Sequence, residues 1–414
     1  MRKALVLAVV GCAFWLAPGA LASTWCGNGE LATDRTDIVT GRQIHTVVAI
    51  PAGAPDTFAV TADQLQTDVD SVDAWWVGQD ATRRPRFDLA NFGGTTTCLD
   101  ISIMRLKETG FASADDAFDT ITSELAADGF NSPYKKSLVY YSGPSIETNV
   151  CGVGGGDFDG PGVAIVIPTG CPTVPSDTVL AHELLHALGA VPPGDPHACP
   201  GDAAHVCDSP TDVLYPTTHG EPLSQKVLDY NHDDYYAHSG AWPDIQDSLW
   251  LSHLDQPQLA FKVAFVGSGT VTSDVPGIAC VLTCVTQWDT GSEFAVTATP
   301  SVGQRFVGWR GACTGISDYC SVTLTTPEAT TAVFGPARIP VKTAVKGKGR
   351  IACTPRCSLS FHAGTPLTLR AVPAKGWRFS RWSGACKGTR AVCRPKTDFA
   401  LSVRASFAKK PASR

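Results

Sequence analysis

The sequence His182-Glu183-Leu184-Leu185-His186 lies within an apolar, helix-forming run from Val179 to Leu188. On an α-helix, residues four apart share one face, with roughly 5–6 Å between their Cβ atoms. That spacing lets the imidazoles of His182 and His186 reach one Zn²⁺ at about 2.0–2.1 Å. Glu183 stands beside the pair and can take a proton from a water molecule at such an ion. Average residue frequencies give roughly a one per cent chance of this pattern in a chain of such length, so the motif predicts a zinc site.

The N-terminus has the pattern of a secretory signal peptide at residues 1–22. Two basic residues precede an apolar run from Ala4 to Leu16, and Ala20-Leu21-Ala22 offers a small-residue cleavage site. An alternative interpretation takes residues 9–12 as the lipobox of a lipid-anchored protein, but the apolar run continues past Cys12. No later segment has the roughly 18 apolar residues that a transmembrane helix needs. We therefore expect a secreted, extracellular chain with no membrane span.

Cysteine usage fits an oxidising compartment. Fourteen cysteines remain once Cys12 leaves with the signal, and an even number in a secreted chain indicates disulfides. Spacing alone does not prove the connectivity, and Cys26 could instead be a thiol that ligates zinc in a latent form. In the first half of the chain the natural pairs are Cys151 with Cys171, Cys199 with Cys207, and Cys26 with Cys98.

The organisation of the chain changes near residue 256. Helical and strand patterns alternate before this point, and short β-type runs separated by Gly, Pro and Cys follow it. The expected domains after the signal peptide are a catalytic domain at 23–256, a β module at 261–336 and a basic β module at 337–408.

The second half is an internal repeat. Four cysteines recur with a shift of 73 residues, and Trp309-x-Gly311-Ala312-Cys313 recurs as Trp382-x-Gly384-Ala385-Cys386. Each copy is expected to be a small, disulfide-stapled all-β module with its tryptophan in the core rather than stacked on carbohydrate. The repeated cysteines are Cys280, Cys284, Cys313 and Cys320, followed by Cys353, Cys357, Cys386 and Cys393.

The two copies resemble secreted bacterial repeat modules with a G-x-G-x-V start and an F-x-G-W-x-G-x-C core. The start is represented by Gly267-Ser268-Gly269 and Gly347-Lys348-Gly349, while Arg381 replaces the glycine before Trp382. The resemblance implies stalks or surface-binding domains without catalytic groups. Residues 337–414 also hold eighteen Lys or Arg and one acid, Asp398. Such a module could bind an anionic cell-wall polymer, polysaccharide or nucleic acid, or it could simply be a solubilising face attracted to the acidic first domain.

The first domain alternates between predicted strands and predicted helices. Ser113 is expected to cap one helix, and Ser176 or Asp177 is expected to cap the helix that carries the histidine pair. The predicted strands are 44–50, 99–106, 137–141 and 163–167, and the predicted helices are 62–77, 113–127 and 179–188.

From Thr178 to Pro216 the chain resembles the secreted metzincin-like zinc metalloproteases, with the motif H-E-x-x-H-x-x-G ending at Gly189. The resemblance implies an α+β zincin-like domain, in which a mixed sheet packs on an active-site helix. The family's third zinc ligand falls three residues after the glycine, where this chain has Pro192. The candidates further along are His197, which we favour, then His205 and Asp195.

The resemblance also implies that residues 212–216 form the hydrophobic turn beneath the metal, with Leu214 at the position of the family's methionine. Tyr215 could stabilise an oxyanion there, although a packed tyrosine is the commoner role. The pattern Asp229-x-Asn231-x-Asp233-Asp234 has oxygen ligands at calcium-like spacing but lacks the glycine and glutamate of an EF-hand loop.

The predicted function is that of a secreted zinc endopeptidase acting on protein or peptide substrates, with Zn²⁺ held by His182, His186 and His197. Glu183 is the predicted general base. Two other classes stay open. The chain could be a catalytically silent, zinc-stabilised adhesin or cell-wall-binding protein, or a metal-dependent hydrolase of a cell-wall amide.

Overall fold

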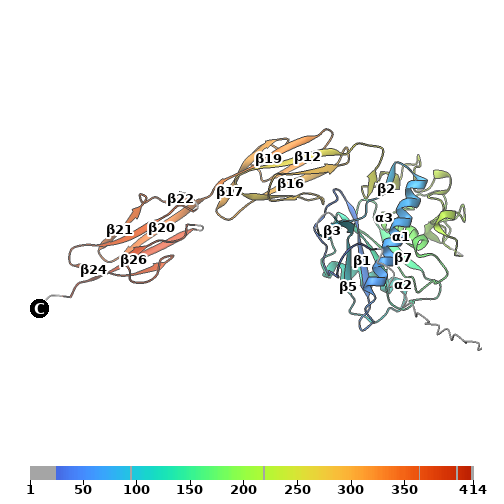
Figure 1. The fold of residues 1–414 in the computed structure, drawn as a ribbon, viewed down its shortest axis with the longest axis horizontal. Helices are drawn as coiled ribbons and strands as arrows, with labels where there is room; N and C mark the ends of the chain where they lie inside the picture. Colours follow the sequence, from blue (N-terminus) through green and yellow to red (C-terminus); the bar gives the residue numbers. More distant parts are fainter. Residues whose placement is uncertain (1–24, 94–95, 218–219, 363, 398–399, 412–414) are drawn as a thin grey trace, which may run out of the picture.

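The computed structural model describes residues 25–93, 96–217, 220–362, 364–397 and 400–411. The signal peptide predicted at residues 1–22 lies outside them. Figure 1 shows a mixed α/β domain followed by two all-β modules. Across the described ranges, no helix has both the length and the apolar character to cross a membrane.

The centre of the first domain is a five-stranded sheet with the order β5-β1-β6-β8-β7. The first four strands are parallel, and β7 is an antiparallel edge strand. The run predicted as one strand at 99–106 is divided, because Leu99 ends β4, which pairs with β3. The bounds are β1 Gln43–Ile50, β3 Leu89–Asn91, β4 Thr97–Leu99, β5 Ile101–Arg105, β6 Lys135–Tyr141, β7 Gly152–Gly156 and β8 Gly162–Val166.

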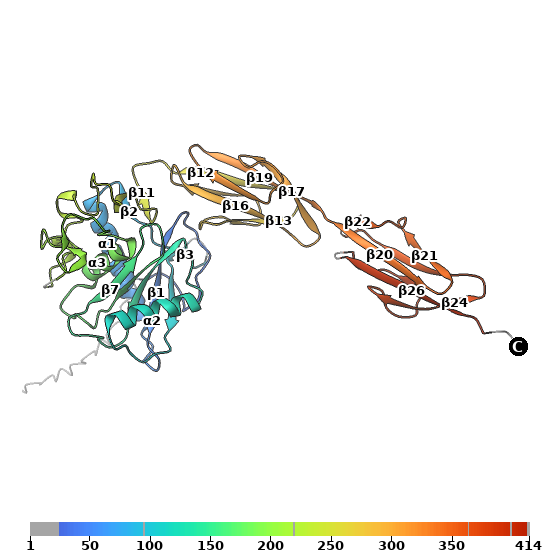
Figure 2. The ribbon, with the colours of Figure 1, turned by 180° about the vertical axis from the view of Figure 1, so that it is seen from behind.

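Three α-helices cover the two faces of this sheet, α1 (Phe58–Gln79) and α3 (Ser176–Leu188) on one side and α2 (Ala114–Ala127) on the other. Figure 2 shows α2 across the face opposite to α1 and α3. Alternate residues of β1 point into the hydrophobic cores on opposite faces of the sheet. Val48 packs in the core beneath α1 and α3, and Val47 packs in the core beneath α2. Because both faces are buried, β1 and β6 end in apolar runs, at residues 47–50 and 138–141.

Of the two predicted helix N-caps, the one of α2 is confirmed and the one of α3 is wrong. The Ser113 hydroxyl accepts a hydrogen bond from the Asp116 backbone nitrogen at 3.1 Å, which confirms the predicted cap of α2. The prediction of Ser176 or Asp177 as the cap of α3 is wrong, because both residues lie in the first turn after Pro175. There the Asp177 carboxylate accepts a hydrogen bond from Ser71 on α1 at 2.6 Å.

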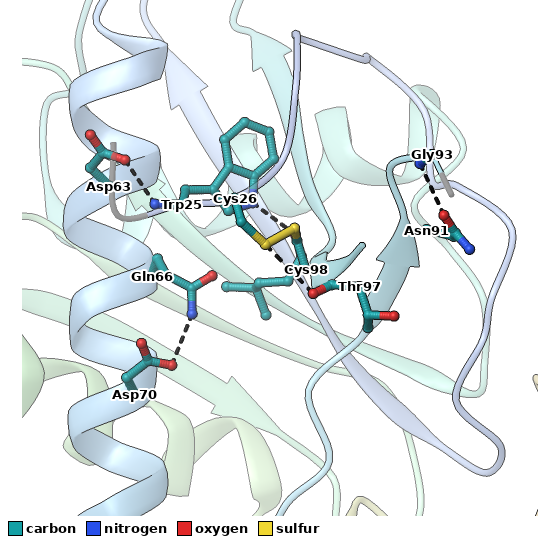
Figure 3. Close-up of a disulfide and its surroundings, with 10 residues drawn as sticks. Trp25, Cys26, Asp63, Gln66, Asp70, Asn91, Gly93, Thr97 and Cys98 are labelled. Carbon is teal, nitrogen blue, oxygen red and sulfur yellow. Dashed lines mark hydrogen bonds between the residues drawn. A yellow bond between two sulfur atoms is a disulfide. The ribbon is translucent and has the colours of Figure 1, made fainter. Parts of the chain in front are cut away.

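Three disulfides hold the first domain in the pairing favoured by the spacing, Cys26–Cys98, Cys151–Cys171 and Cys199–Cys207. Cys26 is therefore bonded to Cys98 rather than held as a free thiol. Figure 3 shows this disulfide beside α1, where the Trp25 backbone nitrogen donates to Asp63 at 3.0 Å. Shorter elements complete the domain: β2 Arg83–Pro85, β9 Ala198–Cys199, β10 Asp202–Val206, β11 Leu251–His253, and the 3₁₀ turns Leu223–Gln225, Tyr230–His232 and Ile245–Asp247.

Each module consists of two sheets around a small core, with the orders β15-β12-β19-β17 and β14-β13-β16-β18, then β22-β20-β26-β24 and β21-β23-β25. Trp309 and Trp382 are 4% and 3% exposed, which confirms that they are core residues. The disulfides are Cys280–Cys284, Cys313–Cys320, Cys353–Cys357 and Cys386–Cys393.

The strands of the first module are β12 Leu259–Val266, β13 Gly269–Ser273, β14 Ala279–Cys280, β15 Cys284–Trp288, β16 Glu293–Pro300, β17 Gln304–Gly311, β18 Tyr319–Thr323 and β19 Glu328–Pro336. Those of the second module are β20 Arg338–Lys346, β21 Gly349–Thr354, β22 Ser360–His362, β23 Thr368–Pro373, β24 Trp377–Gly384, β25 Val392–Cys393 and β26 Leu401–Lys409.

Candidate metal centre

The helix α3 brings together the two histidines of the motif. Their Nε2 atoms are 3.1 Å apart, as the spacing of four residues requires. Most of the remaining helix is fixed in the core by apolar side chains, including Leu184 and Leu185, which are 1% and 0% exposed. The helix ends at Gly189, whose φ of 88° is the left-handed conformation that glycine adopts readily. The motif is therefore held rigidly at one edge of the domain core.

The third histidine of the group is His205. Its Nε2 lies 3.1 Å from Nε2 of His182, and the three histidines form one group of potential metal ligands. His205 lies on β10, which pairs with β9 in a hairpin closed by the Cys199–Cys207 disulfide. Side chains alternate along a strand, and the next residue, Val206, is fully buried.

The structure does not bring His197, our first choice for the third ligand, to this pair. Its Nδ1 is 2.7 Å from Oδ1 of Asp234, and its side chain is 40% exposed. Asp195, the third choice, accepts a hydrogen bond from the His197 backbone nitrogen at 3.1 Å. The physical reason is the hairpin: it carries His205 toward α3, while the residues before it turn toward the segment around Asp234.

Backbone and carboxylate groups orient the imidazoles. Nδ1 of His182 donates to the Val213 carbonyl at 2.7 Å. Nε2 is therefore the unprotonated nitrogen, and its lone pair faces the other histidines. Nδ1 of His205 lies 2.9 Å from Oδ1 of Asp202, without the alignment of a hydrogen bond. The hydrogen bond to Val213 fixes the tautomer of His182, and such an outer contact raises the basicity of a ligand.

Asp212 holds the turn that contains Val213, and sequence reasoning did not identify this role. Its carboxylate is fully buried and accepts hydrogen bonds from the Leu214 nitrogen at 2.7 Å and from the Tyr235 hydroxyl at 2.8 Å. Leu214 is itself fully buried. The sequence signal that could have pointed to it is the position of this aspartate, two residues before Leu214 in the predicted apolar turn.

Glu183 faces the glycine-rich edge strand β7. A Cβ added at Gly152 would lie 2.7 Å from Oε1 of Glu183, and one at Gly154 would lie 3.0 Å from Oε2. The strand can approach α3 this closely only because the residues that face Glu183, Gly152 and Gly154, lack side chains. The sequence Gly152–Gly156 is therefore part of the site, although its glycines predicted no strand.

A cavity of about 680 Å³ opens beside these groups. His182, Glu183 and His205 line it together with Tyr215 and the Cys151–Cys171 disulfide. His182, Glu183 and His205 therefore face a cavity large enough for part of a peptide, and Gly152 of the edge strand β7 borders the same cavity.

Burial controls the protonation of the motif. Burial, followed by the proximity of His205, lowers the pKa of His182 to about 4, and burial also keeps the pKa of His186 well below its usual value. Both imidazoles are therefore neutral at physiological pH, the form that binds metals. Burial raises the pKa of Glu183 to about 8. A carboxyl group in this range can take up and release a proton near neutral pH.

The donor set fits a zinc ion. Two nitrogens at 2.0–2.1 Å from a tetrahedral ion stand about 3.3–3.4 Å apart. Nε2 of His182 lies 3.1 Å from Nε2 of His186 and 3.1 Å from Nε2 of His205. Three imidazoles beside an open cavity match the ligands and the free position of a catalytic zinc site. The buried lone pairs of His182 and His186 face each other, an arrangement that a shared cation stabilises.

Comparison with known proteins identifies the modules more firmly than the first domain. A family profile described as the divergent InlB B-repeat domain matches residues 262–338 and 339–411. The two modules are therefore similar to this repeat, in keeping with the predicted bacterial repeat modules. A comparison with curated protein sequences gives no significant match.

Solved structures give distant likenesses only. Metalloproteinase-II from Bacteroides fragilis is 14% identical over 51% of this chain and 56% of its own, with a TM-score of 0.26. OgpA from Akkermansia muciniphila is 11% identical over 90% of this chain and 97% of its own, with a TM-score of 0.29. The chain thus spans about half the length of the first of these proteins. At such TM-scores the likenesses do not establish a shared fold.

Proposed function

We propose that the chain is a secreted zinc-dependent endopeptidase whose catalytic domain, residues 23–256, has a zincin-like core. His182, His186 and His205 would hold the ion. The observation that carries the proposal is the convergence of three Nε2 atoms, two pairs of them 3.1 Å apart, beside Glu183 at a cavity of about 680 Å³. Seven disulfides fit an oxidising, extracellular compartment.

The chain's own residues supply orientation and proton transfer. When bound, zinc contributes Lewis acidity, which polarises a substrate carbonyl and acidifies water. Glu183 takes the proton of the attacking water and returns it to the leaving amine. The edge strand β7 offers backbone groups to which an extended peptide can pair as an added strand. Proton transfer by Glu183 and strand pairing by β7 together support cleavage of a peptide bond in an extended protein substrate.

The experiment is a Glu183→Gln variant assayed on a peptide library and on purified cell-wall polymer. The amide keeps the shape of the side chain but cannot accept the proton, so zinc binding should persist and peptide cleavage should fall by at least 100-fold. Full activity in this variant would refute the role of Glu183. Zinc binding without turnover of any peptide by the native chain would favour an adhesin, and cleavage of wall polymer alone would favour an amide hydrolase.

A second proposed activity is binding of an anionic surface polymer by the basic module. Six exposed cations, with no acid among them, alternate with inward-facing residues on the β20-β26-β24 part of one sheet: Arg338, Lys342, Lys346, Arg378, Arg381 and Arg404. Lys346 and Arg381 both stand opposite Ser406, so the charges lie on one face. In the first module the places of Arg381 and Arg404 are taken by Gly308 and Thr331.

Binding of a soluble anionic polysaccharide tests this activity. A double variant, Arg381→Gly with Arg404→Thr, should weaken binding at least threefold, and added salt should weaken binding by the native chain. Arg350→Ala, on β21 of the other sheet, is the matched control. Equal binding by all three chains at every salt concentration would refute this role.

A further inference from the structure

A second group of side chains suited to a metal surrounds His197. Asp208, Asp233 and Asp234 each offer an atom within 4.8 Å of the others and of the His197 imidazole. Asp195 joins them, because its carboxyl group contacts that of Asp234. Four carboxylates therefore meet in one place, away from the three histidines of the zinc site.

Four buried carboxylate oxygens of this group lack a hydrogen-bond donor among the described residues. Asp234 is 0% exposed and Asp195 is 8% exposed, and Oδ2 of each has no partner among the described residues. Both oxygens of Asp208 are buried and also lack a partner within the described ranges. A buried carboxylate without a partner is strongly unfavourable. The group therefore needs a shared proton or a bound cation.

A comparable cluster elsewhere in the domain contains its own cation. Asp34 and Asp88 lie near His45, and Nζ of Lys135 is 2.6 Å from each of these two carboxylates. Around Asp208 and Asp234, the described part of the chain provides no lysine or arginine ion pair, and the potential positive charges are those of two histidines, His197 and His238. The first cluster is paired with a buried lysine, whereas the second has no lysine or arginine partner among the described residues.

We propose that Asp195, Asp208, Asp233 and Asp234 bind a calcium ion. Calcium takes six to eight oxygen ligands at about 2.3–2.6 Å, and carboxylates are its usual donors. His197 donates from Nδ1 to Oδ1 of Asp234, so the imidazole orients a ligand instead of competing for the ion.

In this proposal only Asp233 and Asp234 of the calcium-like pattern at 229–234 bind the ion. Asp233 and Asp234 are ligands, while Oδ2 of Asp229 accepts backbone hydrogen bonds from residues 234, 235 and 236 at 3.2, 2.8 and 2.6 Å. Asp229 shapes the loop that presents the two ligands. The remaining ligands, Asp195 and Asp208, come from either side of the β9–β10 hairpin.

Calcium at this place would fix the hairpin that carries His205. Asp208 directly follows Cys207 of the Cys199–Cys207 disulfide, and Asp195 precedes β9. One ion therefore clamps both ends of the hairpin to the loop at 233–234. The ion has a structural role that does not depend on whether the chain cleaves peptides.

Terbium luminescence measures the site directly, because Tb³⁺ replaces Ca²⁺ and is sensitised by a nearby tryptophan. Nε1 of Trp242 donates to the backbone oxygen of Asp234, which brings the indole next to the site. In the zinc-loaded whole chain, excitation of tryptophan should give Tb³⁺ emission that added Ca²⁺ abolishes. Saturating Ca²⁺ should also raise the melting midpoint by roughly 5–10 °C.

Asp208→Asn and Asp234→Asn should each weaken Tb³⁺ and Ca²⁺ binding by at least tenfold, whereas Asp119→Asn, at an exposed position on α2, should bind as the native chain does. If a variant fails to fold, the calcium-dependent rise in the native melting midpoint still tests the site. The proposal is overturned if neither Tb³⁺ emission nor the melting midpoint responds to Ca²⁺. Uptake of a second zinc ion in place of Ca²⁺ would overturn it as well. Neither readout uses peptidase activity, so failure here leaves the zinc endopeptidase proposal untouched.

Discussion

Replacing His205 with alanine tests the third zinc ligand. The change removes the Nε2 atom that lies 3.1 Å from Nε2 of His182. Loss of an outer partner of a ligand typically lowers metal affinity 10–100-fold, so loss of the ligand itself should exceed that range. A 100-fold loss corresponds to about 2.7 kcal/mol of binding free energy. We therefore expect zinc affinity to fall by more than 100-fold and peptide cleavage to fall with it.

The matched control is His197→Ala, which removes the other histidine of the same segment. Its imidazole bonds to Asp234 and is 40% exposed, so zinc affinity should stay within about threefold of the native value. Competition with a fluorescent zinc chelator measures the affinity at saturating calcium, which keeps the carboxylate site occupied in each variant, and circular dichroism monitors the fold. A chain that loses zinc with His197→Ala and keeps it with His205→Ala would refute the reasoning. Retention of zinc by both variants would refute it equally.

Three further predictions concern the surroundings of the site. Gly154→Val would place a Cβ 2.6 Å from the Glu183 carbonyl oxygen and should lower the free energy of unfolding by roughly 1–3 kcal/mol in urea, whereas Gly110→Val, with open space around it, should change little. Burial lowers the pKa of Lys136 from 10.5 to about 7, so unfolding takes up a proton between these values and stability should rise with pH from 7 to 9; urea profiles of Lys136→Met that rise as steeply would contradict this. Asp289→Asn should speed proteolysis between residues 254 and 259, because it removes the ion pair of buried Arg86 that joins the first domain to the first module; an unchanged cleavage rate would rule out that coupling.

The sequence predicted elements whose burial follows a regular pattern. Helices cover both faces of the sheet, so β1 and β6 end in apolar runs and β8 has no polar side chain. The predicted strands at 44–50, 137–141 and 163–167 correspond to these three strands. The strand β7 could not be predicted in this way. Its sequence, Gly-Val-Gly-Gly-Gly, has low strand propensity, and the reason for the glycines is the approach of Glu183 and His186 from α3. The glycines are explained by a tertiary contact, and the hydrophobic periodicity of the sequence gives no information about such a contact.

The ligands of the metal centre also differ in whether the sequence pattern alone could place them. His182 and His186 lie on one helix, so their spacing alone fixed their relation. The position of His205 depends on a hairpin whose register directs Val206 into the core and His205 toward α3. Sequence distance from Gly189 favoured His197, because it carries no information on which side of a strand a residue occupies. The alternation of His205 with an apolar residue next to Cys207 was the available signal.

The hairpin also connects the two proposed ions. His205 reaches the zinc site from β10, while Asp195 and Asp208, at its two ends, reach the carboxylate group around Asp234. A disulfide fixes the separation of Cys199 and Cys207 but leaves the hairpin free to tilt as a unit. Tilting is opposed by its contacts at both ends, so occupancy of the carboxylate site should increase zinc affinity through the position of His205. The coupling is reciprocal by linkage: zinc should raise calcium affinity by the same factor in the native chain, and His205→Ala should abolish that effect while leaving the carboxylates in place.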